Sequence, residues 1–141
     1  MAAKAVLYPM LAMVALTAIV AVTMYRRRVG EMRARRVHPQ KLALSAQMAS
    51  ALEDTRAADN FRNLFEAPVL FYVAMLTIYA TQLTGPLYVG LAWVYVATRI
   101  AHSTIQCTYN RVMHRFLAFA SGLLVLFAIF GLIAVDLLRS G

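Results

Sequence analysis

Three stretches of about twenty uncharged, mostly apolar residues constrain this chain more than any other feature. They are residues 5–25, 67–86 and 116–135, with 21, 20 and 20 residues. A helix needs about 20 residues to cross a hydrocarbon core about 30 Å thick. The chain is 62% hydrophobic and 14% charged, with a mean hydropathy of +0.66, whereas soluble domains are less apolar and more highly charged. We therefore predict an integral membrane protein.

A fourth apolar run, residues 87–98, has only 12 residues before Arg99. It spans a membrane only if its helix continues through Arg99 towards Tyr109. The predicted fold is all-α, a bundle of four transmembrane helices at about 3–25, 55–83, 87–110 and 114–138. Residues 26–54 form a basic connection. Residues 41–61, which begin in this connection and overlap the start of the second helix, are expected to form an amphipathic helix at the membrane interface.

The positive charge is concentrated in the connections. Of fourteen basic residues, nine lie between Arg26 and Arg62, and Arg111 and Arg115 lie between the third and fourth helices. The turn at Gly85-Pro86 carries no charge. The positive-inside rule places both basic connections in the cytoplasm and both termini on the other side. Topology and contact with anionic membrane lipids account for this charge.

Several other classes of protein do not fit this chain. Nucleic-acid binding requires an extramembrane domain that the residues do not provide. The single cysteine, Cys107, excludes an intramolecular disulfide and a CxxC motif. The first apolar run follows Lys4 as in a signal peptide, but it is long and ends in Tyr-Arg-Arg-Arg. We interpret it as a retained first helix.

Polar side chains interrupt two of the predicted helices at regular helical spacing. The first set lies at the start of the second predicted helix and consists of Asp59, Arg62, Asn63 and Glu66. The second set lies along the third predicted helix and consists of Tyr95, Arg99, His102, Gln106 and Tyr109. Offsets of zero, three, four and seven place the first set on one helical face. The second set stays within about 40° of one direction at 100° per residue. Ionisable groups at membrane depth are costly, so these positions are candidate functional sites.

Two interpretations of these polar stripes remain open. Together with Arg111 and Arg115, they provide the cations, carboxylate and amides of a pocket for a small anionic or zwitterionic ligand. Alternatively, Arg62, Glu66 and Arg99 form buried ion pairs that fix helix packing. No metal site is expected, because no second His, Cys or carboxylate lies at ligand spacing from His102 on its helix.

The same residues resemble a known family. Arg62-Asn63-Leu-Phe-Glu66 resembles the Arg-Asn-x-x-Glu motif of the MAPEG proteins, the membrane-associated proteins in eicosanoid and glutathione metabolism. Arg99-Ile-Ala-His102-Ser103 is similar to the Arg-x-x-His-Ser/Thr stretch of their third helix. Arg115 follows Arg99 by sixteen residues, where several members carry an arginine that activates the glutathione thiol. The resemblance covers the whole topology, as a single domain over residues 1–141.

The resemblance implies a homotrimer that binds glutathione, as co-substrate, between subunits near the cytoplasmic side. The implied glutathione ligands are Arg62, Asn63, Glu66, Arg99 and His102, with Gln106 and Tyr109 as further candidates. Arg115 is the implied catalytic residue, because it would stabilise the thiolate. The implied activity is a glutathione transferase or peroxidase reaction on a lipophilic electrophile that enters from the bilayer. We expect a bacterial-type member in the inner membrane.

Two positions depart from the family pattern. Gln106 stands where members commonly carry a tyrosine, and Asp59 stands where some carry an arginine. These departures favour an alternative function, a non-catalytic subunit that uses the fold for packing or lipid binding in a larger complex. A transporter is a weaker alternative, because the helices contain no proton-relay pair.

Overall fold

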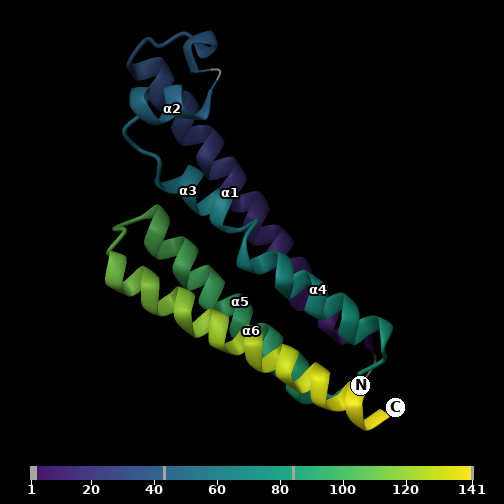
Figure 1. Cartoon of the computed structure of the whole chain (residues 1–141). Helices are drawn as coiled ribbons and strands as arrows, with labels where there is room; N and C mark the ends of the chain where they lie inside the picture. Colours follow the sequence, from purple (N-terminus) through teal and green to yellow (C-terminus); the bar gives the residue numbers. More distant parts are fainter. Residues whose placement is uncertain (1–2, 43, 84, 141) are drawn as a thin grey trace.

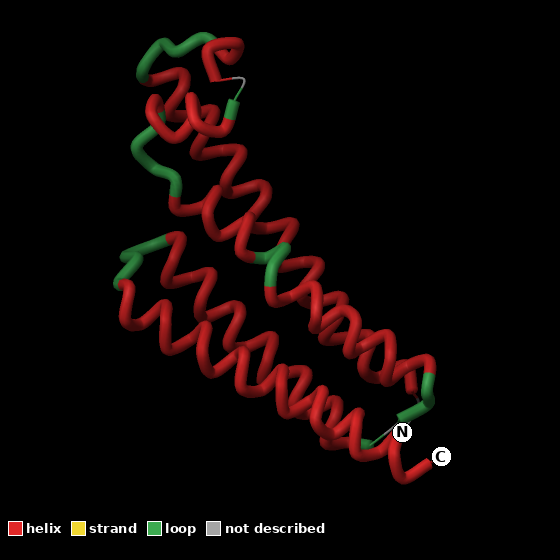
Figure 2. The backbone as a smooth tube through the Cα atoms, viewed as in Figure 1, coloured by secondary structure: helices red, strands yellow, loops and turns green. Residues whose placement is uncertain are grey.

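The structure of the protein is a computed structural model that describes residues 3–42, 44–83 and 85–140. These residues are helical, with no strand among them (Figures 1 and 2). The elements in chain order are η1 (Ala3–Val6), α1 (Leu7–Ala34), η2 (Pro39–Leu42), α2 (Ser45–Ala51), α3 (Arg56–Asn63), α4 (Ala67–Ala80), α5 (Pro86–Cys107) and α6 (Val112–Ser140).

The long helices lie roughly along a common direction, in two pairs. α1 runs beside α3 and α4, while α5 and α6 form an antiparallel hairpin (Figure 1). Both termini lie at one end of the bundle, together with the α4–α5 turn. α2, α3 and the α5–α6 connection lie towards the other end. The basic connections therefore share one end, as their charge distribution predicts for a membrane protein.

α1 continues well beyond the apolar run that predicted it. We expected it to end near Tyr25, but it ends at Ala34. Arginine is a good helix former, so the basic residues extend the helix outside the apolar region. Its 28 residues correspond to a length of about 42 Å, compared with about 30 Å of hydrocarbon. The last turns of α1 therefore project beyond the membrane core.

The second predicted helix is interrupted, which contradicts the expectation of one helix over 55–83. α3 ends at Asn63 and α4 begins at Ala67. Pro68 explains the interruption, because its ring would clash with the carbonyl of Leu64 and it has no N–H to donate. The helix expected over 41–61 is also divided, since the backbone at Leu52 is extended between α2 and α3.

Three helical stretches are long and apolar enough to cross a membrane: Lys4–Ala34, Arg56–Ala80 and Val112–Arg139. α5 has 22 residues but lies outside this set. Polar residues on its buried side, including Arg99, His102 and Gln106, reduce its hydropathy. α5 packs along α6, so its polar residues face the bundle interior.

The apolar core lies between the two pairs of helices. Met13 of α1, Phe71 and Ile78 of α4, and Leu126 and Ile129 of α6 have no exposed surface. Many large apolar side chains on the outer faces of α1, α4 and α6 are exposed instead. Exposed apolar faces of this extent suit contact with lipid or with another membrane helix. The all-helical membrane bundle predicted from the sequence is confirmed.

Candidate functional site

The interruption between α3 and α4 brings Asn63 and Glu66 together. The Nδ2 group of Asn63 donates a hydrogen bond to Oε2 of Glu66 at 3.2 Å. Its Oδ1 atom accepts one from the Arg99 guanidinium at 2.5 Å. One carboxamide therefore links a cation on α5 to a carboxylate at the start of α4. The expectation that Glu66 continues the α3 face is wrong, because α3 ends at Asn63.

Arg99 is the most deeply placed charge of the bundle interior. Only 1% of its surface is exposed, and its Nε atom has no hydrogen-bond partner. Its guanidinium carbon lies 5.9 Å from the centroid of the Phe119 ring on α6. The ion pairs of the described residues join other side chains, and none of them joins the Glu66 carboxylate to Arg62 or to Arg99. The structure therefore does not contain the ion-paired packing core considered from the sequence.

His102 follows Arg99 on α5 and is held at both ring nitrogens. Nδ1 lies 3.2 Å from the Arg115 carbonyl oxygen, and Nε2 lies 2.9 Å from Oε1 of Gln106. Both partners are oxygen atoms that accept hydrogen bonds, so a neutral ring donates to only one of them and a charged ring donates to both. Gln106 thus fixes the orientation of His102.

Arg115, in the first turns of α6, points its guanidinium back to the α5–α6 connection. Nη1 donates to Oδ1 of Asn110 at 2.8 Å. Asn110 has a left-handed backbone with φ of 49°, and its N–H donates to the Ile105 carbonyl at 2.8 Å. Asparagine tolerates this conformation better than most residues. The turn that ends α5 therefore also positions the Arg115 side chain.

A cavity of about 210 Å³ lies between Asn63, His102 and Arg115. Its lining combines polar side chains with apolar ones from α6: Asn63, His102, Arg115, Val112, Phe116 and Phe119. Phe116 and Val112 are largely exposed on the outer surface. The cavity therefore has a cationic and amide inner wall and an apolar rim that faces the region of lipid.

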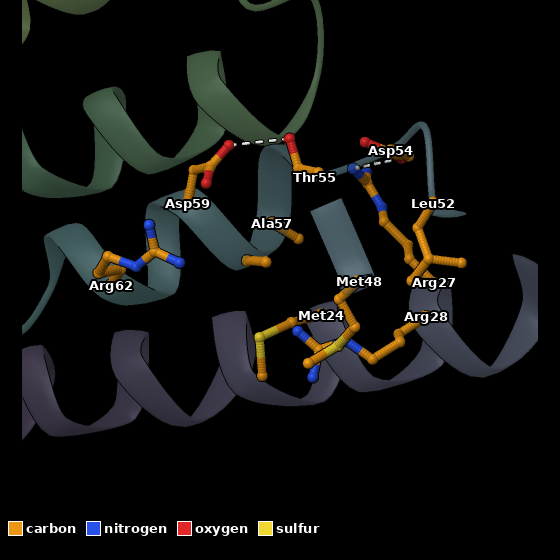
Figure 3. A pocket seen from close by; sticks show the side chains of 11 residues that line it. Met24, Arg27, Arg28, Met48, Leu52, Asp54, Thr55, Ala57, Asp59 and Arg62 are labelled. Atoms are coloured by element: carbon orange, nitrogen blue, oxygen red, sulfur yellow. Dashed lines mark hydrogen bonds and ion pairs between the residues drawn. The ribbon is translucent and has the colours of Figure 1, made fainter. Parts of the chain in front are cut away.

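Two of the predicted site residues lie elsewhere. Arg62 lines a separate cavity of about 200 Å³ between α1, α2 and α3, together with Asp59 (Figure 3). Tyr109 lies beyond the end of α5 at Cys107, so it leaves the predicted stripe. Its hydroxyl lies 3.1 Å from Nδ1 of His114. The structure brings together the remaining candidates: Asn63, Glu66, Arg99, His102, Gln106 and Arg115.

Asn60 is a buried polar residue that the sequence analysis missed. None of its surface is exposed. Its Oδ1 accepts a hydrogen bond from Ser103 Oγ at 3.2 Å, and its Nδ2 lies 3.5 Å from Cys107 Sγ. Asn60 precedes Asn63 by one helical turn, and Ser103 and Cys107 are also one turn apart. That matching spacing is the signal that could have identified this contact between α3 and α5.

Two arginines at the basic end bind the carboxyl terminus of α5. Arg27 of α1 donates to the Cys107 carbonyl at 2.7 Å, and Arg56 of α3 donates to the Thr108 carbonyl. Asp54 pairs with both arginines, at 3.4 Å and 2.8 Å. The hydrogen bond from Arg56 is the main reason why the pKa of Asp54 is lowered. Cations suit a helix C-terminus, where the carbonyl groups are unpaired.

Comparison with known proteins supplies the context for this arrangement. The family model described as MAPEG family matches residues 6–135, nearly the whole chain. No curated protein and no solved structure matches the chain. The match includes α1, both halves of the interrupted helix, α5 and most of α6. With this match and the helical membrane architecture, the chain belongs to the MAPEG family.

Proposed function

We propose that this protein is a glutathione-dependent membrane transferase or peroxidase acting on lipophilic electrophiles. Membership of the MAPEG family supports a membrane protein of glutathione or eicosanoid metabolism. The observation that carries the proposal further is the buried Arg99, with an unpartnered Nε, next to the cavity that Arg115 lines. A buried guanidinium without a carboxylate partner suits a ligand carboxylate.

In this proposal the polar wall binds the tripeptide and the apolar rim receives the electrophile. Arg99 binds a glutathione carboxylate, while Asn63 and Glu66 bind its ammonium and amide groups. Arg115 stabilises the thiolate, which carries the negative charge when the thiol proton leaves. The sulfur then bonds to an electrophilic carbon, and the leaving group departs with its electron pair. With a hydroperoxide, the thiolate attacks the terminal oxygen and the O–O bond breaks, so the alcohol leaves and a sulfenic acid forms. A second glutathione then displaces the oxygen of the sulfenic acid as water and forms the disulfide.

The proposal includes a homotrimer in a bacterial inner membrane, with the basic end of the bundle in the cytoplasm. Glutathione then lies between subunits, and the neighbouring subunit closes the open side of the cavity. The exposed rim residues Val112 and Phe116 support this arrangement, because they are available for contact with a neighbour or with lipid.

Calorimetric titration of the detergent-purified protein with glutathione tests the proposal. We expect binding in the millimolar range or tighter, and thioether formation with a lipophilic aryl halide. Arg115→Ala should reduce turnover by about a hundredfold or more and change the dissociation constant much less. Arg111→Ala is the matched control, because Arg111 is exposed on the same connection. Absence of glutathione binding would falsify the proposal.

A non-catalytic MAPEG subunit is the second candidate function. The contact of His102 with Gln106 and the Arg115 carbonyl favours it, because both ring nitrogens are already engaged within the chain. This candidate predicts no thiol transfer, together with stoichiometric co-purification of a partner protein in mild detergent.

A further inference from the structure

Two hollows lie along one face of α1. A groove of about 620 Å³ is lined almost entirely by apolar groups, among them Met10, Val14 and Ala18. The cavity that contains Arg62 is also lined by Met24 and Arg28 (Figure 3). At 100° per residue, positions 10, 14, 17, 21, 24 and 28 fall on the same side of the helix. The charged cavity and the apolar groove therefore lie one after the other along the same side of α1.

Neighbouring residues also form the opposite walls of the two hollows. Ala58 of α3 lines the charged cavity, and Phe61, one turn later, lines the apolar groove with Phe65. The groove then follows Tyr72 and Leu76 of α4. The two hollows therefore run between the same pair of helical walls, with charge at the basic end and only apolar lining towards the membrane interior.

The charges around the cavity do not cancel. Arg27 is paired with Asp54, and Asp54 is shared with Arg56. Asp59 accepts a hydrogen bond from the Thr55 hydroxyl at 2.9 Å and keeps its negative charge, which is outnumbered by the two positive charges of Arg28 and Arg62 at the same cavity. Arg28 and Arg62 have no ion pair or side-chain hydrogen bond among the described residues. Two guanidinium groups at one cavity are thus available to an anion. Met24 and Met48 line the same cavity, beside the Arg28 side chain (Figure 3).

We propose that this composite groove binds one anionic phospholipid, with its phosphate between Arg28 and Arg62 and an acyl chain along the α1–α4 groove. Arginine suits phosphate because its planar fork makes paired hydrogen bonds. The depth also fits. Ten residues separate Met24 from Val14, which is about 15 Å along a helix and about half of a 30 Å hydrocarbon core. If the glycerol group of the lipid lies beside Met24, its acyl chain therefore ends in the apolar groove.

Binding of the lipid headgroup is tested by native mass spectrometry of the purified protein titrated with phosphatidylglycerol or phosphatidylcholine. We expect phosphatidylglycerol to bind more tightly. Arg28→Gln and Arg62→Gln should each weaken its binding about tenfold, because each removes a hydrogen bond between charged groups. Arg26→Gln is the matched control at the same depth, since Arg26 lies on the opposite face of α1 and should change binding less than twofold.

Binding of the acyl chain is tested with two substitutions to phenylalanine. Ala18→Phe fills the groove and should reduce phosphatidylglycerol binding about tenfold, whereas Ile19→Phe, on the exposed face that points away from Met10 and Val14, should not. Circular dichroism checks that both variants keep their helices. Addition of inorganic phosphate should not displace the lipid.

Four results would overturn the lipid site. The first is equal binding of the two lipids, and the second is an equal loss in Arg26→Gln and Arg28→Gln. The third is displacement of the lipid by inorganic phosphate, which would indicate a site for a free anion. The fourth is an unchanged lipid affinity in Ala18→Phe with a changed oligomeric mass, which would show that a second copy of the chain occupies the groove. None of these outcomes depends on glutathione binding, so the lipid site and the proposed function stand or fail separately.

Discussion

Asn63 shows how one neutral side chain can organise two charges. Its carboxamide accepts from Arg99 and donates to Glu66, so the two charged groups are linked without an ion pair between them. An arginine paired directly with a carboxylate would be neutralised within the protein. The amide bridge leaves most of the Arg99 charge available inside the bundle, and the free Nε of that residue is consistent with this role.

Asn110 has two separable functions, and two substitutions distinguish them. Its left-handed backbone ends α5, and its Oδ1 holds the Arg115 guanidinium. Asn110→Gly keeps the conformation but removes the contact with Arg115. We expect its unfolding temperature to stay near that of the parent, while glutathione turnover falls. Asn110→Ala should also lose about 1 kcal/mol of stability, because alanine disfavours a positive φ.

Thermal unfolding and steady-state kinetics on both variants check this prediction. Parental turnover in Asn110→Gly would show that Arg115 needs no support from Asn110. Equal stability of the two variants would show that the turn does not depend on the residue at position 110.

Asp54 makes the basic end of the bundle sensitive to acid. The Arg56 guanidinium, first by a hydrogen bond and then by its charge, holds the pKa of Asp54 below its ordinary value of 3.8. The folded-state pKa is therefore below the unfolded-state pKa, so the carboxylate stabilises the fold above about pH 4. This stabilisation is lost as the pH falls through the lowered pKa.

Unfolding temperatures at pH 7 and pH 3 test this acid sensitivity. The parent should be more stable than Asp54→Asn at pH 7, and the difference should shrink at pH 3 as Asp54 becomes protonated. Asp59→Asn is the control on the same surface, because Asp59 does not contact Arg27 or Arg56. If the difference in unfolding temperature between the parent and Asp54→Asn is the same at both pH values, the prediction is wrong.

At the scale of elements, hydropathy identifies the helices but not their interruptions. The apolar runs correctly predict helical segments, and the charge distribution correctly places the basic connections at one end of the bundle. The α3–α4 interruption depends on Pro68, which lies inside an apolar run and does not change its hydropathy. Arg62 and Asn63 both precede that interruption, and as adjacent residues of α3 they differ by about 100° in direction. Arg62 therefore lines the cavity beside α1 while Asn63 contacts Arg99 of α5, so one predicted stripe becomes two sites.

Contacts that depend on how elements meet were not predictable from one sequence. Asn60 is buried because α3 meets α5 at Ser103 and Cys107; the one-turn spacing on each helix marks the two faces, but the pairing of those faces depends on how the helices pack. The positive-inside rule already explained Arg27 and Arg56, so their role at the C-terminus of α5 gave no further sequence signal. Tyr109 was misplaced because the left-handed Asn110 ends the helix early.

The packing of α5 on α6 depends on Gly122. A Cβ atom at this position would lie 2.8 Å from the Thr98 hydroxyl oxygen, which donates a hydrogen bond to the Tyr95 carbonyl at 2.7 Å. Gly122→Ala should therefore destabilise the hairpin by about 1–3 kcal/mol. Adding Thr98→Ala should restore most of that loss, because it removes the clashing atom.

Gly131→Ala is the control for this pair, since nothing lies within 4 Å of a Cβ atom there. Its stability should equal or slightly exceed that of the parent, as alanine is the better helix former. Unfolding in detergent measures the stability of the parent and of the three variants. If the double variant is no more stable than Gly122→Ala, the contact with Thr98 is not the cause of the loss.

At the scale of the whole molecule, one side of α5 is exposed among the residues that the structure describes. Its exposed residues include four small ones at helical spacing: Gly90, Ala97, Ala101 and Thr104. In lipid, small residues allow helix backbones to approach closely and are enriched where membrane helices associate. The opposite side of α5 is buried and carries Arg99 and His102. One face of α5 is therefore suited to contact with another subunit, while its opposite face carries the polar residues of the bundle interior.

We accordingly expect the α5 face to form the contacts of the proposed homotrimer. Ala97→Phe should shift the mass in detergent from trimer to monomer, because the larger ring prevents close approach of the helices. Leu124→Phe on the exposed face of α6 is the control and should remain trimeric. The Ala97→Phe monomer should keep its helical circular dichroism, since none of its own core contacts change.

The monomer should nevertheless lose glutathione affinity, because in the proposed trimer a neighbouring subunit closes the open side of the cavity beside Val112 and Phe116. Multi-angle light scattering and calorimetric titration on the same samples measure the two effects together. A monomer that binds glutathione as tightly as the parent would place the whole site within one chain. A trimer unaffected by Ala97→Phe would instead assign the contact to another face, and the exposed apolar side of α4 would then be the next surface to substitute.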